Sequence, residues 1–437
     1  MPKAAVIYLV VHQPRRPRLP AARLSPEASA AELAQAIFDE PMNRRYFQKV
    51  ARYCYYPAIE EFARHVDCGL RLNIGFSFSF LAQAEAWDRE LLARFRALVA
   101  HPNVELIGVE PYHSFLFWLD IRHFQQRMAW MREALERTFG KRPAVTDTTE
   151  MILSKEIYAA LESAGFRGVL TEGRPQLLEW RSPNYVYLPA GHRMRVLARH
   201  NRLSDDVGYR FSDKDSDVYP LRASDYARWI RDADGDVVVI GWDFETFGEH
   251  HRVDTGIFEF LRWLPGELEY QGVAALNASE ALDRFGEGAY ELELPVPAVT
   301  WAGKGDMGFF LGNPVQQRLF HLARHAYQLC ALSEEPELLD IAMWLAQSDN
   351  LHVLQWYEES NSEAEVSAYF TPDEWWRLGY QRLLGELLRV YENFVGVVSA
   401  RMARRGAAGE PAARPVEASD ELAEPVPRRG AVTAAAS

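Results

Sequence analysis

Carboxylic acids and histidines follow the ends of several apolar segments in the first half of this chain. In chain order the groups are His12-Gln13-Pro14, Ser77-Phe78-Ser79, Glu110-Pro111-Tyr112-His113, Asp147-Thr148-Thr149-Glu150, Glu172-Gly173 and Asp243-Phe244-Glu245. Carboxyl and imidazole groups are the commonest general acids and bases. Two facing carboxyl groups can cleave a glycosidic bond, one as nucleophile and one as proton donor to the leaving oxygen. We therefore expect acid–base chemistry, of the kind that a glycosidase needs, where these groups meet.

Each residue also has an interpretation without chemistry. His12 could be a hydrogen-bonded histidine of the core, and acids such as Glu110, Glu150 and Glu172 could stabilise the first turn of a helix through its dipole. Asp243 is harder to explain in this way because it ends an apolar segment typical of a buried strand. An acid in that position must be paired, hydrogen-bonded or functional.

Other reaction types lack sequence support. The chain has no glycine-rich phosphate loop, no G-x-S-x-G elbow and no H-E-x-x-H helix. A cluster of histidines and acids could instead hold a metal, as in barrel deacetylases, but no His-x-x-x-His pair stands on a loop after a strand. We predict neither a metal nor a cofactor, and we keep the metal-dependent sugar deacetylase as a minor alternative.

The elements that must bring these groups together are parallel strands. Uniformly apolar segments of four to eight residues are typical of strands buried on both faces. We predict strands at Ala4–Val11, Leu70–Phe76, Val104–Val109, Pro143–Thr146, Gly168–Thr171, Val237–Trp242 and Gly272–Leu276. We predict helices between them, including Asn43–Ala63, Ala82–Val99, Phe124–Phe139 and Tyr226–Asp232. Alternating strands and helices predict an α/β fold, with seven strands closing into a barrel and an open doubly wound sheet as the alternative.

The pattern changes after Leu294. Pro314–Ser333, Pro336–Ser348 and Pro372–Arg401 have helical periodicity, and proline suits the first turn of a helix. The stretch after Arg404 is rich in Ala, Pro, Glu and Arg and has no aromatic residue. We therefore predict a catalytic barrel over residues 1–293, a helical bundle domain over residues 294–402 that contributes to the active-site cleft, and a disordered tail over residues 403–437.

Composition limits the partners. The formal net charge is −13 over 437 residues, and no basic block is long enough to follow a phosphate backbone, which argues against nucleic acid and anionic membranes. The three cysteines are sparse and lack C-x-x-C spacing, as expected for reduced thiols. The N-terminus enters an apolar strand at once, without a separate signal segment. We expect a cytoplasmic protein, and the sequence does not indicate its oligomeric state.

Taken together, the motifs resemble glycoside hydrolase family 57, in its α-amylase-like branch. The matching segments are VHQP at 11–14, GVEPYHS at 108–114, TEMI at 149–152, LTEG at 170–173, WRSPNY at 180–185, RLSDD at 202–206, DFETFGEH at 243–250 and TGIFEF at 255–260. The resemblance extends from about residue 4 to about residue 395, and the DFETFGEH segment is its most specific part. It implies an incomplete seven-stranded (β/α) barrel with a helical bundle leaning over the active site.

The resemblance also implies a function and a set of residues. It implies retaining hydrolysis of α-glucans or maltooligosaccharides without a metal, with Glu150 as nucleophile and Asp243 as general acid/base. Sugar-binding positions are implied for His12, Gln13, Tyr112, His113, Glu172, Glu245, His250, Trp301 and Asp306. A 4-α-glucanotransferase, a branching-type transglycosylase and a catalytically disabled carbohydrate-binding homologue are the alternatives.

Several positions depart from the family pattern. Asp147 stands where an arginine is usual, and Arg174-Pro175 replace the usual Ala-Asp. Gly303 replaces an aspartate, and Asn350 stands where histidine is common. Both proposed catalytic acids are retained, which favours a changed substrate over a lost activity. Because the charges are inverted at both ends, one hypothesis is that Asp147 and Arg174 form an ion pair, and the alternative is that they are two unrelated, solvated surface charges.

Overall fold

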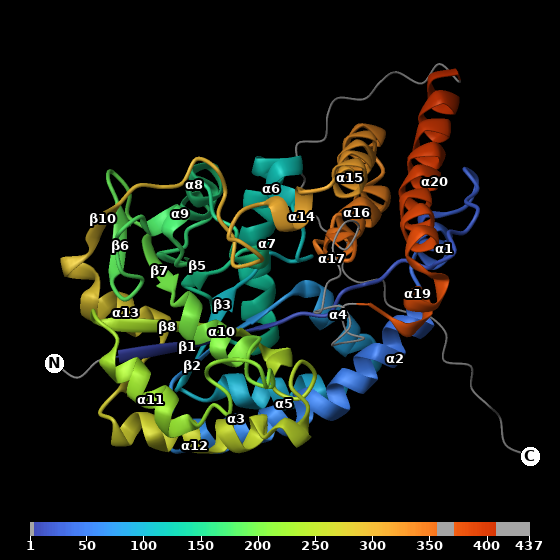
Figure 1. The fold of residues 1–437 in the computed structure, drawn as a ribbon. Coiled ribbons are helices and arrows are strands. Elements are labelled where there is room, and N and C mark those ends of the chain that lie inside the picture. The colour runs from blue at the N-terminus through green and yellow to red at the C-terminus, as the bar shows by residue number, and fades with distance from the viewer. Residues whose placement is uncertain (1–3, 356–370, 408–437) are drawn as a thin grey trace, which may run out of the picture.

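Seven parallel strands form a closed ring, which lies on one side of the molecule, with the long C-terminal helices on the other (Figure 1). The computed structural model describes residues 4–355 and 371–407. The ring consists of β1 (Ala4–Val11), β2 (Leu72–Phe76), β3 (Val104–Gly108), β4 (Val145–Thr146), β5 (Gly168–Glu172), β7 (Arg195–Arg199) and β8 (Val237–Asp243). Each strand pairs in parallel with its two neighbours, and the contact of β7 with β8 closes the ring. The predicted seven-stranded barrel is confirmed.

The identity of the seventh strand differs from the prediction. The segment predicted at Gly272–Leu276 forms only the short β9 (Ala274–Ala275), which pairs with the first residues of β1 outside the ring. The ring is completed instead by β7, whose terminal arginines conceal its short apolar centre in the sequence. β7 also pairs with β6 (Val186–Pro189) in antiparallel fashion, and β6 pairs with β10 (Tyr290–Leu292).

Helices surround the strands and connect them. The first half of the chain contains α1 (Ala30–Ile37), α2 (Glu40–Val50), α3 (Tyr56–Asp67), α4 (Phe78–Trp87), α5 (Arg89–Ala100), α6 (Leu116–Leu119), α7 (Ile121–Phe139), α8 (Lys155–Ser163) and α9 (Pro175–Leu178). It is followed by α10 (Asn201–Gly208), α11 (Ala223–Asp232), α12 (Ile257–Tyr270) and α13 (Ala278–Phe285). The helix predicted at Asn43–Ala63 is divided by a π-helical turn at Ala51–Tyr55, a feature often found at functional sites.

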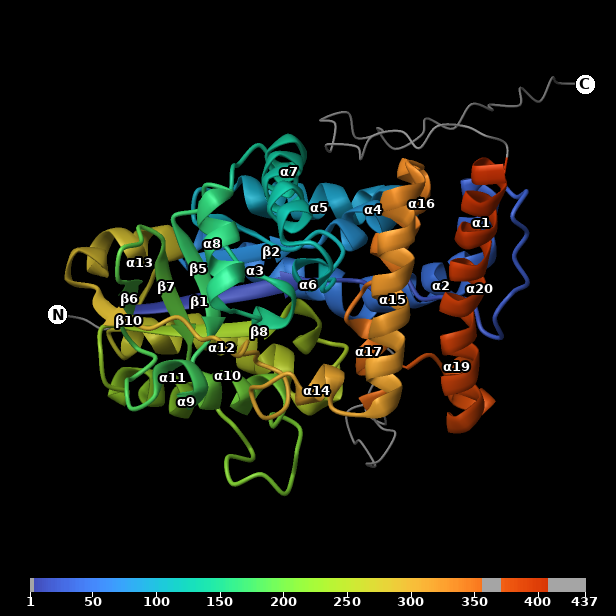
Figure 2. The same cartoon turned by 90° about the horizontal axis from the view of Figure 1, so that it is seen from above.

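The last part of the chain is helical, with its long helices at one end of the barrel (Figure 2). Its elements are α14 (Gly308–Leu311), α15 (Pro314–Ser333), α16 (Pro336–Leu345), α17 (Asp349–His352), α19 (Asp373–Leu378) and α20 (Tyr380–Ala407). Asn313 caps α15 in a capping box, and Pro314 occupies the first turn. Residues 403–407 of the predicted tail belong to α20, and residues 408–437 lie outside the described part of the chain.

Two layers of apolar side chains enclose the strands. Along β1, Val6 and Tyr8 belong to a core cluster that continues into α15, α16 and α20. The alternate residues Ile7 and Leu9 belong to a second cluster, beneath α3, α5 and α12. β1 is therefore buried on both faces, as its uniformly apolar sequence predicts. In the described part of the chain, none of the helices has the length and apolar character that a membrane span requires.

Candidate active site

A cavity of about 220 Å³ lies where the C-terminal ends of the barrel strands meet the helical region. We call it the inner cavity. Five of the residues selected from the sequence line it, namely His12, His113, Glu150, Asp243 and Trp301. The other lining residues are Arg174, Asp205, Tyr209, Arg210, Ala302, Gly303, Phe309, Asp349 and His352.

Glu150 has an unusual backbone conformation. Its φ of 57° and ψ of 28° lie in the left-handed region, which is uncommon for residues other than glycine and is concentrated at functional sites. Trp301 and Thr300 hold this turn by donating hydrogen bonds to the Glu150 carbonyl oxygen. The neighbouring Leu153 pairs with Val299 in an antiparallel bridge. The turn after β4 is therefore held in place by the segment that carries Trp301.

The Glu150 carboxylate has two hydrogen-bond donors. The indole Nε1 of Trp301 donates to Oε2 at 2.6 Å, and the Ser348 hydroxyl donates to Oε1 at 3.3 Å. The His113 Nδ1 atom lies 3.8 Å from Oε1. Burial raises the pKa of Glu150, whereas the hydrogen bond from Trp301 lowers it.

Asp243 provides the second carboxyl group, at the end of β8. Burial, followed by the negative charge of Glu150, raises the pKa of Asp243 to about 7, while the nearby Arg199 charge acts in the opposite direction. The indole donor favours the charged form of Glu150, so we infer that Glu150 loses its proton first. At pH values below about 7 and above the pKa of Glu150, the pair then holds one proton, on Asp243.

Two histidines and an aspartate line the cavity beside Glu150. The rings of His12 and His113 are stacked, with centroids 4.3 Å apart, and His12 Nε2 lies 3.1 Å from Asp349 Oδ2. The other nitrogen of His12 is 2.8 Å from the Ser77 hydroxyl, and Nδ1 of His113 is 3.0 Å from the Ser348 hydroxyl. Burial, together with the His12 charge, lowers the pKa of His113 to about 3, so His113 is neutral at physiological pH.

Among the described residues, His12, His113 and Asp349 form a group that could hold a metal ion. Their ligand atoms lie within 4.8 Å of one another. The two rings are stacked side by side, and the three side chains together present hydrogen-bond donors and acceptors to the cavity.

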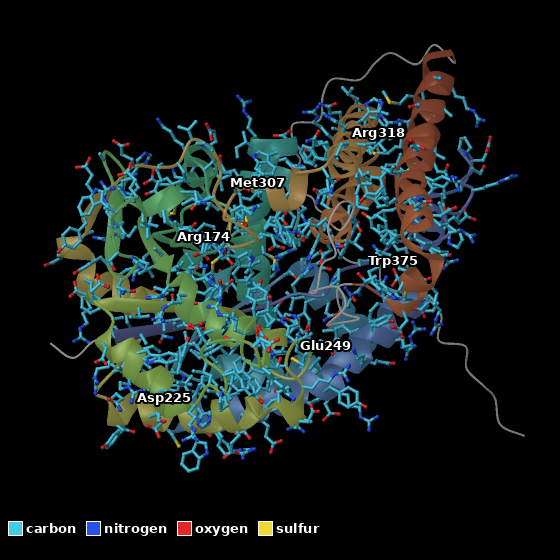
Figure 3. All side chains as sticks on the ribbon, in the orientation of Figure 1. Arg174, Asp225, Glu249, Met307, Arg318 and Trp375 are labelled. Atoms are coloured by element: carbon cyan, nitrogen blue, oxygen red, sulfur yellow. The ribbon has the colours of Figure 1, made fainter. Side chains whose placement is uncertain are left out.

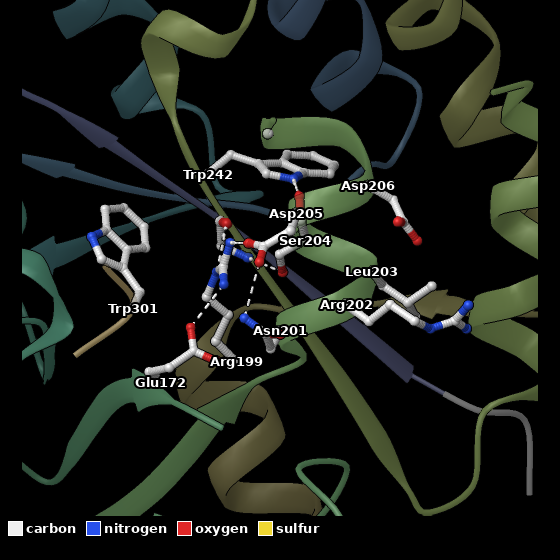
Figure 4. A network of polar contacts seen from close by, with 12 residues as sticks. Glu172, Arg199, Asn201, Arg202, Leu203, Ser204, Asp205, Asp206, Trp242 and Trp301 are labelled. Carbon is white, nitrogen blue, oxygen red and sulfur yellow. Dashed lines mark hydrogen bonds and ion pairs between the residues drawn. The ribbon is translucent and has the colours of Figure 1, made fainter. Parts of the chain in front are cut away.

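A buried ion network supports Trp301 from the side of the barrel (Figure 4). Arg199, at the end of β7, donates to Glu172 at 2.8 Å, to Asp205 at 2.6 Å and to the Gly241 carbonyl oxygen at 3.0 Å. Its guanidinium carbon lies 5.4 Å from the centre of the Trp301 ring. Gly241 permits this arrangement, because a Cβ atom there would lie 3.2 Å from Arg199 Cδ and 2.9 Å from a neighbouring methionine.

The remaining predicted sugar-binding residues do not line the inner cavity. Gln13 and Glu245 are both buried and both bond to the Tyr55 hydroxyl, which lies in the π-helical turn. Glu172 is fully buried in its ion pair with Arg199. These three side chains position their neighbours and have no access to a substrate in this cavity.

Tyr112, His250 and Asp306 also lie outside the lining. Tyr112 is buried and donates to Asp340 on α16 at 2.9 Å, which connects the loop after β3 to the helical region. His250 is partly buried, and burial, together with the charges of His251 and His352, lowers its pKa to about 3. Asp306 is exposed and accepts a hydrogen bond from the Gly308 amide.

Asp147 does not pair with Arg174, so the expected charge exchange is wrong. Asp147 is buried beneath the cavity, where it accepts hydrogen bonds from the Tyr8 hydroxyl at 2.8 Å and from the Thr148 amide at 2.6 Å. Arg174 lines the cavity itself and donates to the Trp301 carbonyl oxygen at 3.3 Å. Asp147 comes directly after β4 and faces the barrel interior, whereas Arg174 lies on the rim.

Sequence reasoning missed the residues that the helical region contributes. Asp349 and His352 belong to α17, and Phe309, on α14, packs against the His352 ring at 4.9 Å. The SDN segment at 348–350 was noticed only for its departure at Asn350. A serine and an aspartate among apolar helical residues were the available signal for this site. Arg199 was missed because β7 was not predicted.

Comparison with known proteins identifies relatives. A model of glycosyl hydrolase family 57 matches residues 6–295. A Methanocaldococcus jannaschii protein named "Putative alpha-amylase" is 34% identical over 357 residues, which cover 78% of this chain and 74% of the relative.

Solved structures share the fold. A GH57 branching enzyme from Thermococcus kodakaraensis, in complex with glucose, has a TM-score of 0.58 and 15% identity, covering 91% of this chain and 96% of its own. A 4-alpha-glucanotransferase from Thermococcus litoralis has a TM-score of 0.59 and 15% identity, covering 80% of this chain and 56% of its own.

Proposed function

The chain belongs to glycosyl hydrolase family 57, and from this premise we propose that it cleaves α-glucosidic bonds in α-glucans or maltooligosaccharides with retention of configuration. The observation that carries the proposal is the pairing of Glu150 and Asp243 across one cavity. Burial raises the pKa of both acids, to about 7 for Asp243, and the indole hydrogen bond opposes this shift at Glu150. Two carboxyl groups whose surroundings differ in this way suit a nucleophile and a proton donor.

The proposed reaction is a double displacement. Glu150 attacks the anomeric carbon and forms a glycosyl–enzyme ester, while Asp243 transfers its proton to the departing glycosidic oxygen. Asp243 then removes a proton from an incoming hydroxyl group, which displaces Glu150 and restores both acids. Retention requires the two carboxyl groups to lie about 5–5.5 Å apart in the substrate complex.

We further propose that His12, His113 and Asp349 bind hydroxyl groups of the sugar that undergoes attack. This is supported by their position in the inner cavity beside Glu150. Trp301, which also lines the cavity, orients the proposed nucleophile through its indole N–H.

The nucleophile is tested by Glu150→Gln. This variant should lose turnover of maltooligosaccharides and retain their binding, because the amide preserves shape and removes nucleophilicity. NMR of the first product formed by the unmodified enzyme should show the α-anomer. A variant with more than a few per cent of the original rate would contradict the assignment.

The acid/base is tested by Asp243→Asn. The variant should be slow on natural glucans and much less impaired on activated aryl glycosides, whose leaving groups need little protonation. Azide should partly restore the second step by acting as an external nucleophile. Equal losses on both substrate types would assign Asp243 to another role.

The nature of the acceptor separates the related activities. Water gives an amylase-type hydrolase, and a sugar hydroxyl gives a 4-α-glucanotransferase or a branching-type enzyme. Product analysis on maltooligosaccharides and glycogen distinguishes these outcomes. A protein that binds these sugars but transforms none of them would be the disabled carbohydrate-binding homologue.

A further inference from the structure

A second and larger cavity, of about 640 Å³, adjoins the active site. We call it the outer cavity. Arg174 lines both cavities, so they adjoin at this side chain. The outer cavity lies between the loop after β5, the start of α10 and the segment that carries Lys304.

The two cavities differ in charge. The inner cavity has the acids Glu150, Asp205, Asp243 and Asp349 among its lining residues. The outer cavity is lined by Arg174, Arg202 and Lys304 and, among the described residues, by no aspartate or glutamate. This concentration of positive charge occurs in a chain whose formal net charge is −13.

The three cations are available for a ligand. Within residues 4–355 and 371–407, none of them forms an ion pair with a carboxylate, whereas Arg199 nearby forms two. The Arg202 guanidinium lies 5.9 Å from the centre of the Trp229 ring and is turned away from the Arg199 network (Figure 4). Like charges that line one cavity repel one another, and a bound anion would relieve that repulsion.

Arg174 is held in position between the cavities. Its Nη2 donates to the Trp301 carbonyl oxygen, and it lies beside the segment that carries Met307 (Figure 3). A Cβ atom at Gly305 would lie only 2.5 Å from Arg174 Cδ, so glycine is needed where these two segments of the chain meet. Gln176 donates to the Lys304 carbonyl oxygen at 2.8 Å and joins the same two segments.

The start of α10 adds to this field. His200 caps the helix by accepting a hydrogen bond from the Leu203 amide, and both His200 and Asn201 line the outer cavity. The N-terminal end of a helix carries a partial positive charge and favours anions. The outer cavity therefore offers mainly hydrogen-bond donors and positive charge, and few acceptors for neutral sugar hydroxyls.

We propose that the outer cavity binds an anionic group, a phosphate monoester or a carboxylate, on a sugar unit next to the bond that is cleaved. The planar guanidinium of Arg174 matches the paired oxygens of either group, and Lys304 supplies a mobile point charge. The proposal rests on the proposed glycosidase function and specifies its substrate class as acidic oligosaccharides.

Binding is measured by calorimetry in the Glu150→Gln protein, so that turnover does not interfere. The ligands are neutral maltotriose, maltotriose with a phosphate monoester on either terminal glucosyl unit, and maltotriose with a terminal glucuronic acid. At least one charged ligand should bind about tenfold more tightly than the neutral one, the gain expected from one good charge-assisted contact. The preference should weaken as salt concentration rises.

Two double variants separate the cavity from general electrostatics. Arg202→Gln/Lys304→Gln should reduce the preference to about threefold or less, because the charge-assisted contacts are lost. Arg122→Gln/Lys155→Gln removes the same charge from exposed positions outside both cavities and should retain the preference. Equal affinity for neutral and charged ligands, or equal losses in both variants, would overturn the proposal and leave the glycosidase function standing. Failure to bind any of the ligands would overturn both.

Discussion

In the proposed mechanism Asp243 and Glu150 share one proton, and their mutual repulsion should determine how activity depends on pH. The pKa of Asp243 is raised to about 7 by burial and by the Glu150 charge. The proposed mechanism requires Asp243 protonated and Glu150 ionised. We therefore expect kcat/KM to fall as the pH rises through about 7, and to fall again at acidic pH as Glu150 becomes protonated.

The origin of this shift can be measured directly. Glu150→Gln removes the charge that helps to raise the pKa of Asp243, so that pKa should fall in the variant. Carbon-13 NMR titration of the aspartate carboxyl groups, with Asp243→Asn to assign the signal, gives both values. An unchanged Asp243 pKa in the Glu150→Gln protein would mean that burial alone sets it and that the two groups are further apart than the reaction requires.

Asp147 is the residue at which the sequence was most misleading. Burial raises its pKa well above the usual range, and the charges of Glu150 and Asp243 add to the effect. Asp147 therefore keeps its proton to higher pH in the folded protein than in the unfolded chain. The raised pKa costs stability as the pH rises above the unfolded value, because only the unfolded chain then releases the proton.

Asp147→Asn should consequently stabilise the protein at pH 7–8, and the gain should disappear as the pH falls to about 4. Asp147→Arg, the family residue, should cost about 3 kcal/mol or more, because a long cation would enter a buried site that Tyr8 already fills. Thermal denaturation across this pH range provides the measurement. A stability gain from Asn that does not depend on pH would show that Asp147 is ionised in the native state.

At the scale of elements, long and regular patterns were predictable and short ones were not. The predicted bounds of β1 and α15 agree with the structure, because eight apolar residues and a proline-started amphipathic segment leave little ambiguity. β7 escaped prediction because two of its five residues are arginines. One of these arginines, Arg199, is the centre of the ion network beside Trp301. Because the strand was not predicted, this part of the site was not predicted either.

The site residues that directly follow strands, such as Glu150 and Asp243, could be predicted from the sequence. The sequence could not show that Gln13 and Glu245 turn toward Tyr55, because that contact depends on the π-helical turn in which Tyr55 lies. Nor could it show that α17 brings Asp349 to His12, a contact between residues 337 positions apart.

The segment that carries Trp301 contacts Glu150, the proposed nucleophile. Its indole N–H lowers the pKa of Glu150. Trp301→Phe keeps an aromatic ring and removes this donor, so the pKa of Glu150 should rise and the acidic limb of kcat/KM should move to higher pH. Trp263→Phe, at an exposed position on α12, is the matched control and should leave the profile unchanged. Identical acidic limbs in all three proteins would remove Trp301 from this role.

At the scale of the whole molecule, the barrel and the helical region share one apolar core. The cluster that contains Tyr8 and Ile107 of the barrel also contains Leu319 of α15 and Leu387 of α20. Both helices contact α17, which carries Asp349: α15 packs against it, and Tyr391 of α20 accepts a hydrogen bond from Asn350 of α17 at 2.9 Å. The division into a barrel over residues 1–293 and a bundle over residues 294–402 remains a prediction from the sequence. Because the two parts share one apolar core, we expect the stability of each to depend on the other.

Leu387→Ala tests this dependence. Leu387 is fully buried in α20, remote in sequence from every proposed catalytic residue. Its truncation should cost about 2–5 kcal/mol by leaving a cavity in the shared core. Because one cluster joins both regions, loss of activity and unfolding of the barrel should occur together on heating, at a lower temperature than in the unmodified protein. Far-ultraviolet circular dichroism and residual activity, followed in parallel, provide the two curves.

Leu332→Ala, at an exposed position of α15, is the control and should shift neither curve. If Leu387→Ala abolished activity well below the temperature at which the barrel unfolds, the helical region would be an independent unit, and its contribution of Asp349 to the site would be separable from the stability of the barrel.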